Sequence, residues 1–152
     1  MGYQLIYNSS FKDIDENTIN IEIYRDSGGT LIASELLCSA DAVSINYESD
    51  DDVFKPIKCS DCQINVLTTK VLANLYTALG NQIYCTISKN GSLLWCGYSV
   101  PCLYSTDYNE EYNLLSLQFN DILSSLNNYN YTYLKAVYSV FLSGNQTYHK
   151  PD

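Results

Sequence analysis

Two cysteines have the spacing that comes nearest to a known chemistry in this sequence. Cys59 and Cys62 flank two residues, as the cysteines of half a zinc site or of a thiol–disulfide redox pair do. A zinc site needs a second pair of ligands, but the other four cysteines stand singly and the only histidine is His149. A redox pair needs its first cysteine at a helix N-terminus, whereas the residues from Cys62 onward alternate as a strand does. We therefore expect packed free thiols, with no metal and no cofactor.

A run of acidic residues is the second group with ion-binding chemistry. Its members are Glu48, Asp50, Asp51 and Asp52. A calcium loop of the EF-hand type uses alternate ligands and a glycine at its turn, and three consecutive aspartates without a glycine do not fit that pattern. We interpret the run as a solvated loop that meets a basic surface on a partner, with a calcium site as the alternative.

Side chains for bond chemistry are harder to find. A single histidine near the C-terminus leaves no Ser-His-Asp or Cys-His arrangement. Gly28-Gly29 is typical of a turn and not of a phosphate-binding loop. The many carboxylates would allow an acid pair of the glycosidase kind, but the sequence marks no pair among them. We expect that the chain is not an enzyme, and an acid-pair hydrolase stays a third hypothesis.

The charge balance excludes two classes of partner. Seventeen acidic and eight basic residues give a formal net charge of −9, whereas nucleic acids and anionic membrane surfaces both attract basic proteins. No apolar run approaches the length of a membrane span. The first residues also lack the basic and then apolar pattern of a secretory signal, so we expect reduced thiols. We predict no nucleic acid and no membrane among the partners.

The elements that must position these residues are mostly strands. The clearest one has Ile19, Ile21 and Ile23 on one face and mostly polar residues on the other. Fifteen tyrosines add a residue type that fills strands and interfaces. Period-two patterns predict strands over residues 3–7, 18–24, 35–39, 41–48, 62–66, 82–89, 92–100 and 112–120. Residues 30–33 are expected to pair back on the preceding strand in a hairpin.

The dipeptide Asn90-Gly91 is the strongest local signal. It allows positive φ at both central positions, which predicts a two-residue type I′ hairpin. In the simplest register Cys85 faces Cys96, while Trp95 lies on the opposite face of the pair. Since the two cysteines then occupy a hydrogen-bonded pair, whose geometry fits a disulfide poorly, we expect two packed thiols there.

Two stretches have the periodicity of a helix, and a capping residue indicates a further short helix. Residues 69–79 place apolar side chains on one helical face, and Asp121 is expected to cap a short helix that ends at Leu126. Residues 134–142 predict a final amphipathic helix, with a strand as the alternative because Val, Tyr and Phe favour strands too.

These elements predict a mainly β fold, a barrel or sandwich of antiparallel strands with two or three short helices. The length suits one domain, or one domain with an appendage. We divide the chain into a β-rich domain over residues 1–130 and a C-terminal helix with a loose tail over residues 131–152.

Several short blocks resemble one family. The most individual is Tyr-Glu-Ser-Asp-Asp-Asp-Val-Phe-Lys-Pro-Ile-Lys at residues 47–58. Further blocks at residues 11–15, 21–23, 91–101 and 119–126 follow in matching order. Together they cover residues from about 10 to about 130, and the chain resembles tail proteins from phages and prophages of gut Bacteroidetes, crAss-like phages included.

The resemblance implies a tail-hub-like or baseplate-type domain with a structural role in the virion. In that class, barrels associate around the tail axis into rings. The implied partners are copies of the chain in a ring and other tail proteins. The implied location is the virion tail, assembled in the cytoplasm of the bacterial host.

Three regions are candidate contact surfaces: the acidic crossover at 48–57, the loop at 101–111 and the final helix. Tyrosine is enriched at interfaces, and core packing is the alternative for the tyrosines. The competing class is an extracellular module that binds glycans or proteins through an exposed Trp95 or the tyrosines at 104–112. The candidate interface residues are Glu48, Asp50, Asp51, Asp52, Phe54, Tyr104, Tyr108, Tyr112, Tyr138 and Phe141.

Overall fold

The computed structural model describes residues 2–47, 59–70, 72–77, 79–100, 105–107 and 113–125. These residues form a mainly β structure, which confirms the predicted class. The strands are β1 (Gly2–Lys12), β2 (Thr18–Ser27), β3 (Ser34–Glu35), β4 (Leu37–Tyr47), β5 (Ser60–Thr68), β6 (Ile83–Lys89), β7 (Ser92–Ser99), β8 (Ser105–Asp107) and β9 (Asn113–Asp121). The helices are a 3-10 turn, η1 (Ala73–Leu75), and α1 (Ile122–Ser125).

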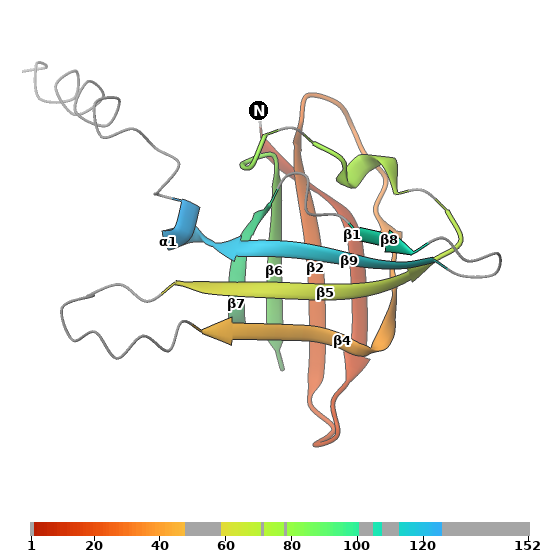
Figure 1. Ribbon diagram of the computed structural model, residues 1–152, viewed down its shortest axis with the longest axis vertical. Coiled ribbons are helices and arrows are strands. Elements are labelled where there is room, and N and C mark those ends of the chain that lie inside the picture. Colours follow the sequence, from red (N-terminus) through yellow and green to blue (C-terminus); the bar gives the residue numbers. More distant parts are fainter. Residues whose placement is uncertain are drawn as a thin grey trace, which may run out of the picture.

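One sheet doubles over to make two layers. The strand order is β3-β1-β2-β6-β7-β9-β5-β4, with β8 beside β9 on a branch. Pairs are antiparallel except β1 with β3. Figure 1 shows β4, β5 and β9 crossing in front of β1, β2, β6 and β7. The layers are joined at two seams: β7 pairs with β9 at one, and β3 continues through Leu36 into β4 at the other.

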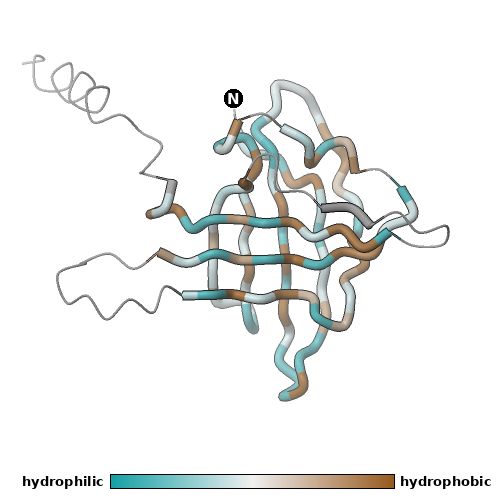
Figure 2. The backbone as a smooth tube through the Cα atoms, viewed as in Figure 1, coloured by the Kyte–Doolittle hydropathy of each residue, from teal (hydrophilic) through white to brown (hydrophobic). Residues whose placement is uncertain are grey.

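The core lies between the layers and is filled by alternate residues of the long strands. Figure 2 shows hydrophobic and hydrophilic residues alternating along them. Burying one such aliphatic side chain contributes about 1.5–3 kcal/mol, so the two-layer arrangement follows from the period-two pattern. The central members are Ile21, Ile23, Ile64, Val66, Ile83, Cys85, Ile87, Leu117 and Phe119, each 1% exposed or less.

The β6–β7 hairpin has the predicted turn but not the predicted register. Asn90 and Gly91 both have positive φ, 51° and 81°. The register shifts after Ser88 pairs with Leu93, so that Ile87 pairs with Trp95 and Leu94 is the extra residue of a bulge. A bulge moves every later residue of its strand to the other face. The predicted pairing is therefore wrong beyond the bulge, although Lys89 pairs with Ser92 as the simplest register requires, and Trp95 faces the core.

Residues 30–33 do not form the predicted strand. Both edges of β2 are occupied, by β1 on one side and β6 on the other, so β2 has no edge left for a hairpin partner. The first strand is also longer than predicted, because β1 continues to Lys12 beyond a register shift between Leu5 and Tyr7.

The helix predicted over residues 69–79 is reduced to η1. Leu72 before it and Tyr76 after it have non-helical backbone angles, and η1 has no side-chain cap. Its apolar side chain Leu75 is still buried, at 1% exposure. The predicted cap on the next helix is confirmed, because the backbone N–H of Ser124 donates to Asp121 Oδ1 at 2.6 Å. The helix predicted over 134–142 lies outside the described residues.

Candidate functional site

The interface residues predicted from the sequence all lie outside the described part of the chain. They stay predictions, and the candidate site is built from other residues. They are Glu48, Asp50, Asp51, Asp52, Phe54, Tyr104, Tyr108, Tyr112, Tyr138 and Phe141.

A groove of about 950 Å³ lies between β1 and β4. Residues 9–14, at the end of β1 and the start of the next loop, line one side, and residues 35–45 line the other. Ile19, Asn65, Ile87 and Leu94 complete the lining. We call this feature the open groove. Its volume falls in the range of ligand clefts, about 300–1,000 Å³, but its walls are strand edges.

Neither wall of the open groove is fully paired. The parallel ladder between β1 and β3 covers only Tyr7 and Asn8 on β1, and the N–H of Leu36 adds a bond to the Asn8 carbonyl at 2.8 Å. Beyond it, among the described strands, β1 pairs only with β2 and β4 pairs only with β5. An unpaired strand edge presents backbone N–H and C=O groups on which another chain can pair.

The β4 wall is also irregular. Cys38 pairs with Val66, but the next paired residue, Val43, faces Ile64, so residues 39–42 have no partner on β5. The Asn65 side chain holds this insertion, because its Nδ2 donates to the carbonyl of Asp41 at 2.9 Å. Insertions of this kind bend a strand, and this one lies along the open groove.

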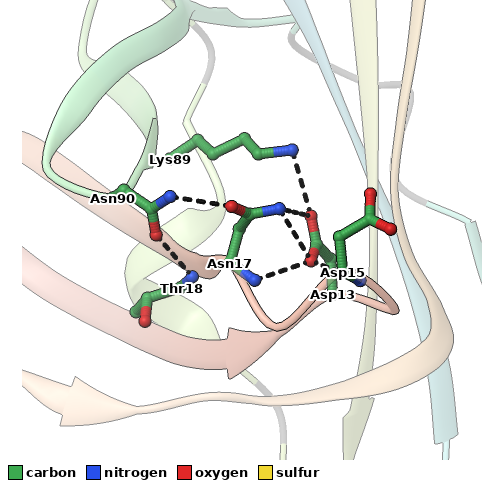
Figure 3. Close-up of polar contacts among 6 residues, drawn as sticks. All are labelled: Asp13, Asp15, Asn17, Thr18, Lys89 and Asn90. Carbon is green, nitrogen blue, oxygen red and sulfur yellow. Dashed lines mark hydrogen bonds and ion pairs between the residues drawn. The ribbon is translucent and has the colours of Figure 1, made fainter.

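The loop after β1 borders the open groove and is locked by side-chain hydrogen bonds (Figure 3). Asp13 Oδ1 accepts bonds from the backbone N–H of Asp15 at 2.9 Å and of Asn17 at 2.8 Å. Asn17 Nδ2 donates to both Asp13 oxygens, at 3.1 and 3.0 Å. Asn90 ties this loop to the β6–β7 turn, donating to Asn17 Oδ1 at 2.8 Å and accepting from the Thr18 N–H at 2.9 Å.

The charge of Asp13 is stabilised by the same contacts. Hydrogen bonds from the Asn17 side chain are the main reason that the pKa of Asp13 is lowered to about 2, and the Lys89 ammonium 3.1 Å from Oδ2 adds to the effect. The Lys89 side chain is 41% exposed, and exposed ion pairs contribute little. The amide–carboxylate contacts, more than the ion pair, therefore set the loop conformation.

Apolar side chains surround the open groove. Ile14 on the locked loop is 99% exposed, Leu37 at the start of β4 is 62% exposed, and Leu94 in the β7 bulge is 49% exposed. All three line the same groove. One exposed leucine needs no explanation, but apolar side chains gathered at one concave place are typical of a site that binds another molecule.

The other seam, which we call the closed corner, consists of Ser60, Trp95, Gly97, Asn120 and Asp121. Trp95 Nε1 donates to Ser60 Oγ at 3.0 Å. The hydroxyl and backbone N–H of Ser60 donate to Asp121 Oδ2 at 3.0 and 2.7 Å. Burial opposes the ionisation of Asp121, but the bonds from Ser124 and Ser60 outweigh it and hold its pKa below the ordinary value.

Gly97 allows the layers to meet at the closed corner. A Cβ on this residue would lie 2.1 Å from the Asn120 carbonyl oxygen and 2.4 Å from the Trp95 ring. Trp95 is only 5% exposed, so the competing hypothesis is wrong in taking Trp95 as exposed, while the tyrosines that it offers as the other option lie outside the described residues. The physical reason is the β7 bulge, which turns Trp95 inward.

Tyrosines form a row on the outer face of the β1–β2–β6–β7 layer. Tyr84 faces Tyr24 on one side and Tyr98 on the other, with ring centroids 6.3 and 5.3 Å apart. Tyr3 lies 5.9 Å from Tyr84 and 6.3 Å from Tyr98. The sequence does not predict the row, because in the register without a bulge Tyr98 would lie on the same face as Cys85, and only the bulge moves it to the outer face.

The cysteines of the described strands are poorly suited to thiol chemistry. Cys62 is 1% exposed, and burial raises its pKa to about 12. Burial also raises the pKa of Cys85, which pairs with Gly97 and not with Cys96 as predicted. Cys59 immediately precedes β5 and not a helix. Thiolates are the reactive and metal-binding form, so these environments disfavour a redox pair at Cys59 and Cys62.

The described residues contain neither a metal-binding cluster nor a membrane-spanning helix. No group of three or more His, Cys, Asp or Glu side chains among them is arranged to hold a metal ion. No helix within these same ranges has the length and apolarity to cross a membrane. What the described residues do offer is a groove with backbone edges and apolar side chains.

No family model, curated protein or solved structure matches this chain. The candidate site is therefore defined by its own geometry. It joins two unpaired strand edges, a locked loop and three exposed apolar side chains, which is an arrangement suited to binding a polypeptide.

Proposed function

We propose that this chain is a structural subunit of a phage tail or tail-like particle, which assembles around the tail axis through protein–protein interfaces. The observation that carries the proposal is the open groove, with its unpaired edges on β1 and β4 and its apolar residues Ile14, Leu37 and Leu94. The sequence blocks that resemble tail proteins support a phage tail or tail-like particle as the assembly.

The composition of β4 supports assembly through its edge. Proteins that must stay monomeric protect edge strands with lysine, proline or inward charges. β4 has neither lysine nor proline, and Asp41 is its only charged residue. Its insertion at residues 39–42 interrupts pairing only in the middle, whereas residues 43–47 form a regular ladder with β5. Such an edge is suited to a subunit whose partner covers it.

The function is tested by locating the chain in particles. An antibody raised against the purified chain is used for immunogold electron microscopy of tailed particles released from cells that carry the gene. We expect the gold label on the tail, at its axis. Particles that lack the chain, or a purified chain that stays monomeric at all concentrations and turns over a glycan or peptide substrate, would contradict the proposal.

A further inference from the structure

We propose that the open groove binds residues 131–142 of a second copy of this chain as an added strand between β1 and β4. The inference rests on the proposed function and names the partner segment of that assembly. It adds to the proposed function that the C-terminal part of one copy completes the sheet of the next copy.

The edges provide the template. β1 from Ser10 to Lys12 and β4 from Ser39 to Ile45 line the groove from its two sides, and each is paired only on its other side among the described strands. Ser9 lies outside this stretch, because the Cys38 thiol donates to its hydroxyl oxygen across the groove at 3.4 Å. Addition of a strand to such an edge gains backbone hydrogen bonds, and pockets for alternate side chains supply specificity. Three residues of β1 extend over about 10 Å at the rise of a strand, so a short segment is long enough.

The donor has the matching pattern. In residues 134–142, the even positions are all apolar, whereas the odd positions include polar Lys135 and Ser139 as well as apolar Val137 and Phe141. As a strand, which is the alternative to the helix predicted for this segment, it would have one continuous apolar face. Valine, tyrosine and phenylalanine in the segment favour strands. The apolar face would cover Leu37 and Leu94, which are otherwise 62% and 49% exposed.

Charge favours the same pairing. The groove is lined by three carboxylates, Asp13, Glu35 and Asp41, and by one ammonium group, Lys12. Lys135 is the only Lys, Arg, Asp or Glu between residues 126 and 148. A donor with a single positive charge therefore enters a groove with an excess of negative charge, and opposite charges at an interface favour the correct partner.

The position of α1 makes a second copy the partner. α1 contacts β7 and β9, so the chain leaves the described structure at the closed corner. β5 and β4 separate that corner from the open groove in the front layer. A donor that leaves one copy at the closed corner and enters the open groove of the next makes a head-to-tail contact. Contacts of this kind generate a ring when the rotation closes.

The test uses the full chain with a photo-crosslinking amino acid in place of Leu37. Equal amounts of unlabelled and ¹⁵N-labelled protein are mixed, irradiated and mapped by mass spectrometry. We expect crosslinks from position 37 to residues 131–142, including pairs with one labelled and one unlabelled peptide. Crosslinks to this segment only within one isotope form would assign the groove to the chain's own tail and overturn the proposal, as would crosslinks to other segments or none.

A matched pair of variants measures the energetic effect. Leu37→Lys places a charge at the groove, while Leu79→Lys changes a comparably exposed leucine, 56% against 62% exposed, that does not line it. We expect Leu37→Lys to weaken self-association by about tenfold or more in sedimentation velocity, and Leu79→Lys to leave it unchanged. Equal effects of the two variants would overturn the inference.

The two proposals fail differently. If gold labels the tail but the crosslinks lack residues 131–142, strand exchange is wrong and the structural role stands. If the mixed-isotope crosslinks form but the chain is absent from particles, the assembly role in the tail is wrong and strand exchange between copies stands.

Discussion

The two seams of the folded sheet are built in opposite ways. At the closed corner, the strands β7 and β9 pair directly, and the polar side chains of Trp95, Ser60 and Asp121 bond to one another. At the open groove, the two residues of β3 make the only strand bridge among the described residues, and exposed apolar side chains take the place of a buried network. One seam is completed by the chain itself, whereas the other keeps its edges unpaired.

The comparison indicates that one seam stabilises the fold and the other is available for binding. Buried polar groups that are fully bonded make a rigid structure and are costly to change. Edges that face water can change partners at little cost, because water bonds to them in the free state. Substitutions at the closed corner should therefore unfold the chain, while those at the open groove should alter association and leave the fold intact.

The largest effect is expected for Gly97→Ala. Its Cβ would lie 2.1 Å from the Asn120 carbonyl oxygen, so β7 and β9 must separate, at a cost of about 3 kcal/mol in the free energy of unfolding. Chemical denaturation measures it. Gly29→Ala is the control, since nothing lies within 4 Å of its added Cβ, and it should change stability by less than about 0.5 kcal/mol. Equal stability of the two variants would contradict the close approach.

Trp95→Phe should be the next most severe change. It removes the indole N–H that bonds to Ser60 Oγ and part of a buried ring, with an expected loss of about 2 kcal/mol. Thermal unfolding followed by circular dichroism tests this. Tyr24→Phe, on the outer face, is the control and should cost less. A variant as stable as the parent chain would show that the closed corner tolerates disruption.

Asp121→Asn should lower stability by about 1 kcal/mol at pH 7, because Ser60 and Ser124 lose a charged acceptor. The folded pKa of Asp121 is lowered, so its contribution is complete above the unfolded value of about 3.9 and is lost as pH falls through the folded pKa. The difference between parent and variant should shrink in acid denaturation curves. A difference that grows as the pH falls would reverse the assigned sign.

Asn17→Ala should change the locked loop without unfolding the protein. The Asn17 side chain is the main cause of the lowered pKa of Asp13, about 2, so its loss should raise that pKa toward about 3.9. An NMR titration of the Asp13 carboxyl carbon measures the shift. Lys89→Ala serves as the comparison and should raise the pKa less. The opposite order would make the ion pair the main stabilising contact of the loop.

The smallest effect on stability is expected for Ile14→Asn. The side chain is 99% exposed, so the free energy of unfolding should change by less than about 0.5 kcal/mol. Self-association, measured by sedimentation velocity, should nevertheless weaken, because the apolar tip of the locked loop is removed. An unchanged association constant would remove Ile14 from the binding surface.

Local patterns predicted much of the fold. The alternation of Ile19, Ile21 and Ile23 predicted β2, and Asn90-Gly91 predicted the hairpin turn that the structure has. Both signals are local, since a strand period and a turn conformation depend on neighbouring residues. The open groove had no such signal, because it is formed by residues 9–14 and 35–45, which the sheet order brings together.

The sequence by itself determined the β class, the apolar face of most strands and the helix cap at Asp121, because side-chain period and capping act within a few residues. Only the tertiary structure decided that Trp95 is buried and that Tyr98 joins the outer tyrosine row. One inserted residue in β7 reverses the faces beyond it, and the doubling over of the sheet decides which edges are closed. Both depend on how distant strands pair, which no local pattern records.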